Sequence, residues 1–179
     1  METPIGQLSS AAILCLDLGK TSGAWALLID EEVIDHGVVS FHASLSNIQI
    51  HLEMVEIVSR ILKDYEKVGI NAVVYENAYG QIGRSAHEIF YGLAYAVREA
   101  AWKKRIPTYV VNTPQLKKAA TGVANFKGKL PTMKAIDQRY PELELDLTKE
   151  HPASDIADAI AVGLALRDAL RAGRARLAA

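Results

Sequence analysis

Residues 11–18 read AAILCLDL, an apolar run in which Asp17 is the one charged residue. A run of this length and composition predicts a buried β-strand that ends in an acid. Residues 24–29 (AWALLI) and 33–41 (VIDHGVVSF) follow after short turns and predict two more strands. Three short strands joined by tight turns predict an antiparallel meander at the start of the fold.

Beyond this meander, helical and strand patterns alternate. A second apolar run at residues 70–75, INAVVY, predicts a strand that again ends in an acid, Glu76. The remaining predicted elements are helices at 45–65, 85–104, 113–120, 131–139 and 152 to beyond 170, with a fifth strand at 108–111 and Thr113 as the N-cap of the third helix. This order predicts an α/β fold with a mixed five-stranded sheet (βββ-α-β-α-β-α) and helices on both faces. We expect a single domain over residues 1–179, with its core at about 11–172.

Composition excludes several classes of protein. Half of the 179 residues are hydrophobic, yet no stretch reaches the roughly 20 apolar residues of a membrane span. The opening residues METPIGQLSS lack the basic start and apolar region of an export signal, so we expect a cytoplasmic protein. Cys15, the one cysteine, lies inside an apolar run and is expected to be a small core residue.

The formal net charge is −1, but the basic residues are clustered. The clusters are Lys103–Arg105, Lys117–Lys118, Lys127 with Lys129 and Lys134, and Arg167, Arg171, Arg174 and Arg176. A solvated helix face explains any one of these clusters at least as well as contact with DNA.

Four acidic residues are candidates for a functional site, but the surroundings of any one of them do not establish its role. Asp17 and Glu76 end apolar strands, while Asp155 and Asp158 are three residues apart at the start of the last helix and share one face. Each has an ordinary explanation, as a solvated strand end or as an acid that complements a helix dipole. Two adjacent parallel strands would place Asp17 and Glu76 on one edge of the sheet, and the last helix would add the other pair. Bringing four carboxylates together is costly unless cations neutralise them, and hard oxygen ligands suit Mg²⁺ or Mn²⁺. The residues alone thus predict an acidic metal site without choosing its substrate.

Several segments, in the same order and at similar spacing, resemble the RuvC family of Holliday-junction resolvases, which have a ribonuclease H-like fold. The resemblance runs from about Ile13 to Leu166. The segments are LDLGKTSGAWAL (16–27), VVYENAY (73–79), RSAHEIFYGLAYAVREAA (84–101), TPQLKKAATGVANFKGKLPTM (113–133) and ASDIADAIAVGLA (153–165). Three features depart from the family pattern: the turn after Asp17, Tyr79 in place of a phenylalanine, and the long acidic stretch 141–150. These departures suggest a divergent or phage-type member.

The resemblance implies a magnesium-dependent endonuclease that resolves four-way DNA junctions by paired symmetric nicks. It implies that Asp17, Glu76, Asp155 and Asp158 hold two Mg²⁺ (or Mn²⁺) ions in each active site, with Lys117 as a further catalytic residue. The implied DNA-binding residues are Tyr79, Arg84, Lys117, Lys118, Lys127 and Lys129. The family also implies a homodimer, here through the helix Ser85–Lys104 with Ile89, Phe90, Leu93 and Val97; burial of these residues within one subunit is the competing explanation.

Three alternatives stay open. One is a broader nuclease of the same fold that cuts branched DNA or RNA. Another is a junction-binding module without activity, although such a module would gain by losing acids that face phosphates. The third is a sugar kinase or actin-like ATPase, whose first phosphate loop resembles residues 17–21 (DLGKT) but which needs a second, similar domain.

Overall fold

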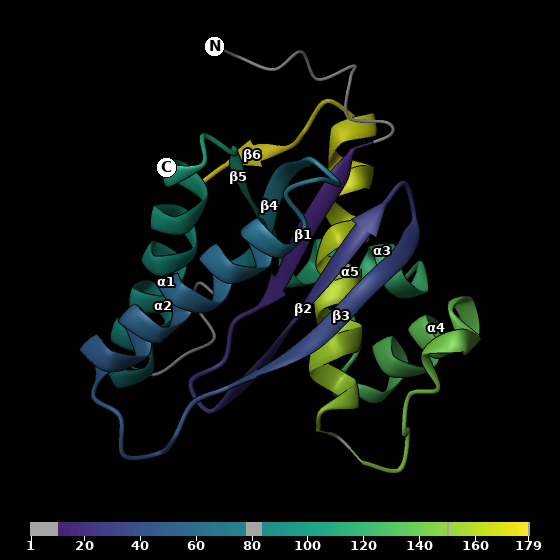
Figure 1. The fold of residues 1–179 in the computed structure, drawn as a ribbon. Coiled ribbons are helices and arrows are strands. Elements are labelled where there is room, and N and C mark those ends of the chain that lie inside the picture. The colour runs from purple at the N-terminus through teal and green to yellow at the C-terminus, as the bar shows by residue number, and fades with distance from the viewer. Residues whose placement is uncertain (1–10, 78–83, 150, 179) are drawn as a thin grey trace.

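The computed structural model describes residues 11–77, 84–149 and 151–178, and for residues 84–86 it describes the backbone alone (Figure 1). Its centre is one mixed sheet with the strand order β3-β2-β1-β4-β5-β6. The strands are β1 (Ala12–Asp17), β2 (Ser22–Ile29), β3 (Glu32–Ser40), β4 (Ile70–Asn77), β5 (Thr108–Asn112) and β6 (Arg176–Leu177). The first three form the predicted antiparallel meander, while β1, β4 and β5 run parallel to one another.

The α/β class and the mixed sheet are confirmed, but the prediction of five strands is one short. Strand β6 pairs antiparallel with β5, with Leu177 opposite Tyr109 and Arg176 opposite Val110. A strand of two exposed residues buries no apolar side chain and therefore leaves no hydrophobic pattern in the sequence.

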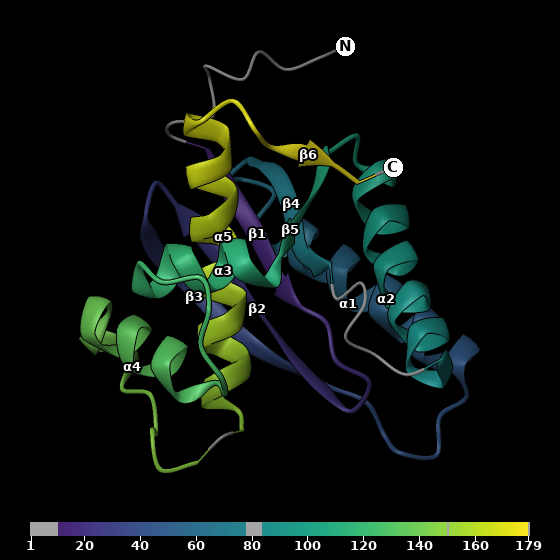
Figure 2. The ribbon, with the colours of Figure 1, turned by 180° about the vertical axis from the view of Figure 1, so that it is seen from behind.

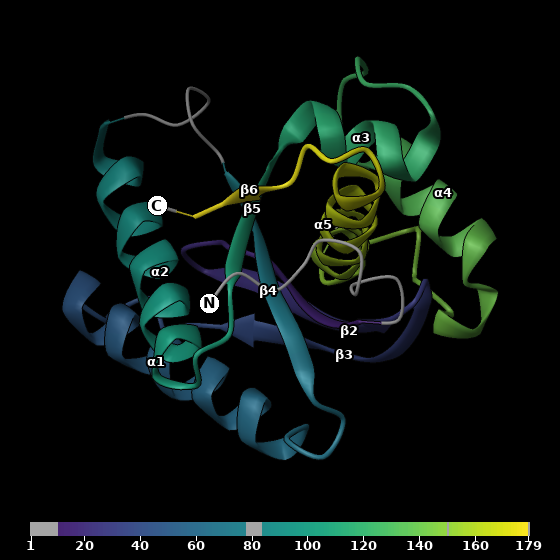
Figure 3. The same ribbon diagram turned by 90° about the horizontal axis from the view of Figure 1, so that it is seen from above.

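Helices cover both faces of the sheet (Figure 3). They are α1 (Asn47–Asp64), α2 (Arg84–Lys103), α3 (Thr113–Thr121), α4 (Leu130–Arg139) and α5 (Ala153–Arg171), with a 3₁₀ turn at Pro141–Leu143. Helices α1 and α2 pack on one face, and α3, α4 and α5 lie on the other (Figure 2). None of the helices in the described parts of the chain is long and apolar enough to span a membrane.

The position of strand β1 in the fold explains why residues 11–18 are almost all apolar. Ile13 and Cys15 face the core beneath α5, whereas Leu14 and Leu16 face the core beneath α1 and α2. Because side chains alternate along a strand and both faces are covered, each position needs an apolar residue. Cys15 is fully buried, as expected, and burial raises the pKa of its thiol.

Helix α5 packs across β1 and β2 and is itself covered by α3 and α4. Sixteen of its residues are buried, which explains why its sequence has no clear polar face. Among them are Ala157, Ala161 and Gly163, small residues that let the helix axis approach the sheet closely. This packing positions the first turns of α5 beside the carboxyl end of β1.

The predicted N-cap of α3 is wrong by one residue. Asn112 caps this helix: its side-chain oxygen accepts a hydrogen bond from the backbone N–H of Gln115, and the Gln115 side chain accepts one from the N–H of Asn112. Thr113 therefore becomes the first helical residue, and its hydroxyl is available for another contact.

Candidate active site

Two of the four acids reach the same edge of the sheet through neighbouring parallel strands. Leu16 of β1 is paired with Tyr75 of β4, so the next residues, Asp17 and Glu76, lie side by side at the carboxyl ends of their strands. The other two acids, Asp155 and Asp158, belong to the first turns of α5. The structure therefore gathers these acids from three elements that are far apart in the sequence.

The turn between β1 and β2 fixes the position of Asp17. A Cβ atom on Gly23 would lie 2.3 Å from the Asp17 carbonyl oxygen, and one on Gly19 would lie 1.8 Å from the Ser22 carbonyl oxygen. Only glycine permits such close backbone approaches. The tight turn also places the Ser22 hydroxyl beside α5.

Asp155 is the most extensively hydrogen-bonded of the acids. Its Oδ2 accepts a hydrogen bond from Ser22 Oγ at 2.9 Å and lies 3.1 Å from His151 Nδ1. Its Oδ1 lies 3.1 Å from Lys129 Nζ. Burial by itself would raise the pKa of Asp155, but the hydrogen bond and charge of Lys129, with the hydrogen bonds from Ser22 and His151, outweigh burial and lower it.

Lys129 joins the two acids of α5. Besides Asp155, its amino group contacts Asp158 Oδ2 at 3.4 Å. The carboxylates act on the lysine in turn: burial opposes its charge, but Asp158, Asp17 and Asp155 together raise its pKa. Lys129 is thus a permanently charged cation inside the acidic cluster.

One lysine does not balance the cluster. Burial, the charge of Glu76 and the charge of Asp155 raise the pKa of Asp158 to about 6, in spite of the opposing effect of Lys129. Burial, followed by the charge of Asp158, raises the pKa of Asp17 well above its ordinary value. Four carboxylates that share one lysine leave an excess of negative charge, so the site is electrostatically suited to further cations.

The position of Lys129 among the acids affects how they could bind a metal ion. In the described parts of the chain, no three His, Cys, Asp or Glu side chains are arranged to hold a metal ion as they stand. Lys129 Nζ occupies the space between Asp155 and Asp158 that a cation bound to both would share. The remaining acid, Glu76, accepts a hydrogen bond of 2.5 Å from Thr113 Oγ1.

The predicted catalytic lysine, Lys117, contacts a backbone carbonyl and an aromatic ring in this structure. Its amino group donates a hydrogen bond of 2.6 Å to the Phe126 carbonyl oxygen and lies 4.7 Å from the centre of the Phe126 ring. It thereby ties α3 to the loop before α4. Lys129, which was predicted only to bind DNA, is the lysine that contacts the acids.

Of the other predicted DNA-binding residues, the structure describes the side chains of Lys118 and Lys127. Lys118 and Lys127 are exposed, on α3 and on the following loop. Tyr79 lies outside the described residues, and Arg84 begins α2 but its side chain is not among those described.

Sequence reasoning missed two polar residues that contact the acids, Ser22 and Thr113. Ser22 begins the strand that pairs with the Asp17 strand, and Thr113 directly follows the strand beside Glu76. Their place next to the acid-bearing strand ends was a usable signal. The side chain of His151 is 59% exposed and also contacts Asp155.

No protein-family model matches this chain, and a comparison with curated proteins finds no match. Solved structures do match. RuvC from Thermus thermophilus superposes with a TM-score of 0.74 at 19% identity, over 93% of this chain and 99% of that one. The same protein in complex with a Holliday junction substrate gives 0.72 at 17% identity, over 94% and 99%. The yeast mitochondrial Holliday junction resolvase Ydc2 gives 0.62 at 13% identity, over 92% and 82%. This chain therefore has the fold of the RuvC-type Holliday junction resolvases.

Proposed function

We propose that this chain is a divalent-metal-dependent endonuclease that cuts four-way DNA junctions. The observation that carries the proposal is the cluster of Asp17, Glu76, Asp155 and Asp158, whose negative charge exceeds what Lys129 can balance. The substrate is suggested by the likeness to RuvC, which has been solved with a Holliday junction bound.

The four carboxylates would hold the metal. They supply hard oxygen donors in a site with excess negative charge, which suits Mg²⁺ or Mn²⁺, two in each active site. When bound, such ions supply activation of water and stabilisation of the leaving oxygen in phosphodiester hydrolysis. Lys129 Nζ contacts both Asp155 and Asp158, so its amino group would have to give up at least one of these contacts for both carboxylates to hold a metal.

The chain's own residues have separate tasks in this proposal. Ser22 and His151 orient Asp155, and Thr113 orients Glu76. Because Lys129 Nζ lies among the acids, it would be the donor to the scissile phosphate in this proposal and would stabilise the developing charge there. Lys117 holds the loop that carries Lys129, through its bond to Phe126.

A junction-binding module without activity is less compatible with the site. Asp155 is only 2% exposed and belongs to a network of Ser22, Lys129 and His151. Such a network costs free energy to bury and would repel phosphates, so a protein that only binds DNA gains nothing from it.

The proposal is tested by incubating the protein and Mg²⁺ with labelled four-way junctions, flaps, duplex DNA and RNA–DNA hybrid. We expect paired, symmetric nicks in the four-way junction and little cutting of the other substrates. Equal cutting of all branched forms would show a broader nuclease. Binding of junctions without cutting by the wild-type protein would refute the catalytic assignment.

A four-way junction has two equivalent strands to cut, so we also propose a homodimer with two active sites. Ile89, Leu93 and Val97 of α2, which sequence reasoning favoured for dimerisation, are buried against their own subunit. The same helix instead exposes 59% of Tyr95 and 77% of Trp102, seven residues apart on one side of the helix. Large exposed aromatics on one helix face are typical of a protein interface.

A further inference from the structure

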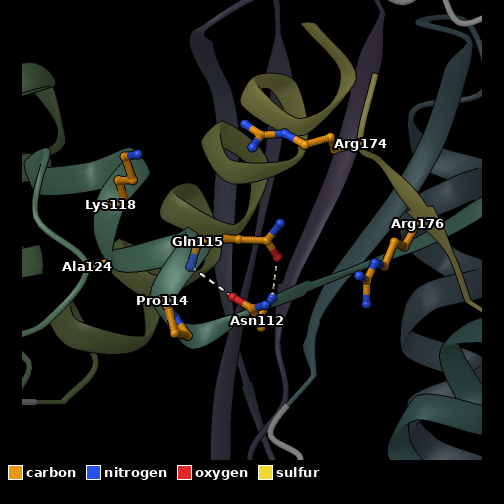
Figure 4. Close-up of a pocket in the computed structure, with 7 residues that line it drawn as sticks. All are labelled: Asn112, Pro114, Gln115, Lys118, Ala124, Arg174 and Arg176. Carbon is orange, nitrogen blue, oxygen red and sulfur yellow. Dashed lines mark hydrogen bonds between the residues drawn. The ribbon is translucent and has the colours of Figure 1, made fainter. Parts of the chain in front are cut away.

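A cavity of about 540 Å³ lies between α3 and the segment that leads from α5 into β6 (Figure 4). Asn112, Pro114 and Gln115 line it at the start of α3. Lys118 borders it from the next turn of α3, and Arg174 and Arg176 border it from the other side. The cavity is therefore walled by α3 on one side and by the segment that leads into β6 on the other.

The charge of this cavity is positive and unbalanced. Lys118, Arg174 and Arg176 are exposed, and in the described parts of the chain none of the three has an ion pair or a side-chain hydrogen bond. Arg171 and Arg139, in contrast, both pair with Glu31. No carboxylate lines the cavity as far as the structure describes it.

The positive charge resides on the side chains rather than on the helix terminus. The backbone N–H groups of Asn112 and Gln115 are already bonded, each to the other residue's side chain, at 2.9 and 3.0 Å. An anion in this cavity would therefore be bound by one ammonium and two guanidinium groups. Guanidinium groups match phosphate oxygens with two parallel hydrogen bonds.

The cavity adjoins the acidic site along the same edge of the sheet. Asn112, which lines the cavity, is paired with Asn77 of β4, and the next residue, Thr113, bonds to Glu76. Strand β6 is two strand spacings from β4, about 10 Å. Because base pairs are stacked about 3.4 Å apart, this distance corresponds to roughly three base pairs of duplex.

We propose that the cavity binds backbone phosphates of the DNA arm that leaves the active site across β5 and β6. The proposal rests on the proposed function and adds to it the surface that guides one arm of the junction. The cavity has unpaired cations without acids, and it lies at the distance that a duplex arm reaches a few base pairs from the cut. Free phosphate or another small anion shares the chemistry and is distinguished below.

The test measures the affinity of the full-length protein for a fluorescent four-way junction in EDTA, from low to high salt. The variant carries Arg174→Ala and Arg176→Ala together. Each lost phosphate contact lowers the slope of log affinity against log salt by about 0.9, so we expect a slope about 1.8 shallower. Between 50 and 200 mM salt, the wild-type protein should therefore lose about 12-fold more affinity than the variant.

Two controls isolate the cavity from general electrostatics and from misfolding. Arg60→Ala with Lys67→Ala removes two exposed charges from α1 and the loop that follows it, on the other side of the sheet, and should leave the slope unchanged. Arg174→Lys with Arg176→Lys keeps the charge and should retain most of the slope. Circular dichroism should show the same unfolding temperature for all the variants.

The outcomes separate the two proposals. A wild-type protein that cuts junctions, with an unchanged slope for the Arg174→Ala, Arg176→Ala variant, overturns the cavity assignment and leaves the proposed function standing. A wild-type protein that does not bind junctions overturns both. If the wild-type protein binds inorganic phosphate and the Arg174→Ala, Arg176→Ala variant does not, while the two have the same junction slope, the cavity is a site for small anions and the DNA assignment is wrong.

Discussion

At the scale of single residues, the charge balance of the acidic site depends on Lys129. Its amino group contacts Asp155 and Asp158 at once, while both Asp158 and Asp17 retain raised pKa values. The cluster is therefore stabilised by one internal cation and remains attractive to others. Lys117 lies close in sequence but contacts Phe126 instead.

Matched substitutions to methionine, which keeps much of the side-chain volume, distinguish the role of Lys129 from that of Lys117. We expect Lys129→Met to slow junction cleavage by roughly 10²–10³-fold, the usual effect of losing one donor to a developing negative charge. It should also destabilise the metal-free protein at neutral pH by roughly 1–3 kcal/mol, because Asp155 loses its cation.

Lys117→Met should lose about 1 kcal/mol of stability with its single hydrogen bond and retain most of its cleavage rate. Single-turnover cleavage and urea unfolding measure both effects. A larger loss of cleavage in Lys117→Met than in Lys129→Met would contradict this division of roles.

The raised pKa of Asp158 predicts how stability depends on pH. Its folded-state pKa of about 6 exceeds the ordinary 3.8, so the folded protein holds this proton more tightly than the unfolded chain does. The contribution to stability is therefore fully present below about pH 4 and is lost as the pH rises through about 6. For this group alone the loss amounts to about 3 kcal/mol in the absence of metal.

Asp158→Asn removes the titrating group and should flatten this part of the pH profile, so that the variant gains stability relative to wild type above about pH 6. Asp168→Asn, an exposed acid on the same helix, is the matched control and should keep the wild-type profile. Urea unfolding in EDTA at several pH values gives the comparison. Parallel profiles for wild type and Asp158→Asn would show that burial of this carboxyl has no energetic consequence.

At the scale of elements, the site depends on how closely α5 approaches the sheet. A Cβ atom on Gly163 would lie 2.4 Å from Cys15 Sγ and 3.0 Å from Leu28 Cδ2. Both neighbours are fully buried side chains, so neither can move into solvent. The closeness of this contact keeps the first turns of α5 beside the strands that carry Asp17 and Ser22.

Gly163→Ala should therefore destabilise the protein by about 1–3 kcal/mol through overpacking, although alanine favours helix formation. Cys15→Ala should restore part of this loss in the double variant, because it removes the nearest atom. Gly92→Ala on α2 is the control: its Cβ would meet nothing within 4 Å, and it should be stabilising by roughly 0.5–1 kcal/mol. Thermal unfolding of wild type, Gly163→Ala, Cys15→Ala and the double variant gives the cycle, Gly92→Ala is measured beside it, and a stabilised Gly163→Ala would refute the packing argument.

The two strands that carry Asp17 and Glu76 were predictable, because a long apolar run marks a buried strand and one acid follows each run. Three features were not predictable. Strand β6 is too short to leave a pattern, and the cap of α3 depends on whether Asn112 or Thr113 reaches Gln115. Which lysine contacts the acids depends on the path of the loop 122–129, and the spacing of residues does not determine that path.

At the scale of the whole molecule, a single sheet edge carries the acids, the cavity next to β5 and β6, and the polar residues between them. The other notable surface is on α2, where Arg98 lies 4.3 Å from the centre of the exposed Tyr95 ring and Trp102 is the next exposed aromatic on that side. If the proposed function is correct, cutting two strands of one junction takes two such molecules, and we expect the exposed aromatics of α2 to form the contact between them.

We expect the wild-type protein to be a dimer at micromolar concentration by light scattering. Trp102→Glu should weaken dimerisation by at least about 30-fold, the equivalent of losing a buried aromatic anchor worth about 2 kcal/mol. Val123→Glu introduces the same charge at an exposed apolar residue of the loop after α3 and should leave the dimer intact. A wild-type monomer, or a variant that dimerises normally, would show that α2 is not the interface.

The measurement that tests the central claim most directly compares two substitutions of the same kind on one helix. Single-turnover cleavage of a labelled four-way junction in Mg²⁺ is measured for wild type, Asp155→Asn and Asp168→Asn. We predict paired nicks with 5′-phosphate ends for the wild type and for Asp168→Asn, and no cleavage by Asp155→Asn although it still binds the junction. Cleavage by Asp155→Asn at the wild-type rate would contradict the assignment of the acidic cluster as the nuclease centre.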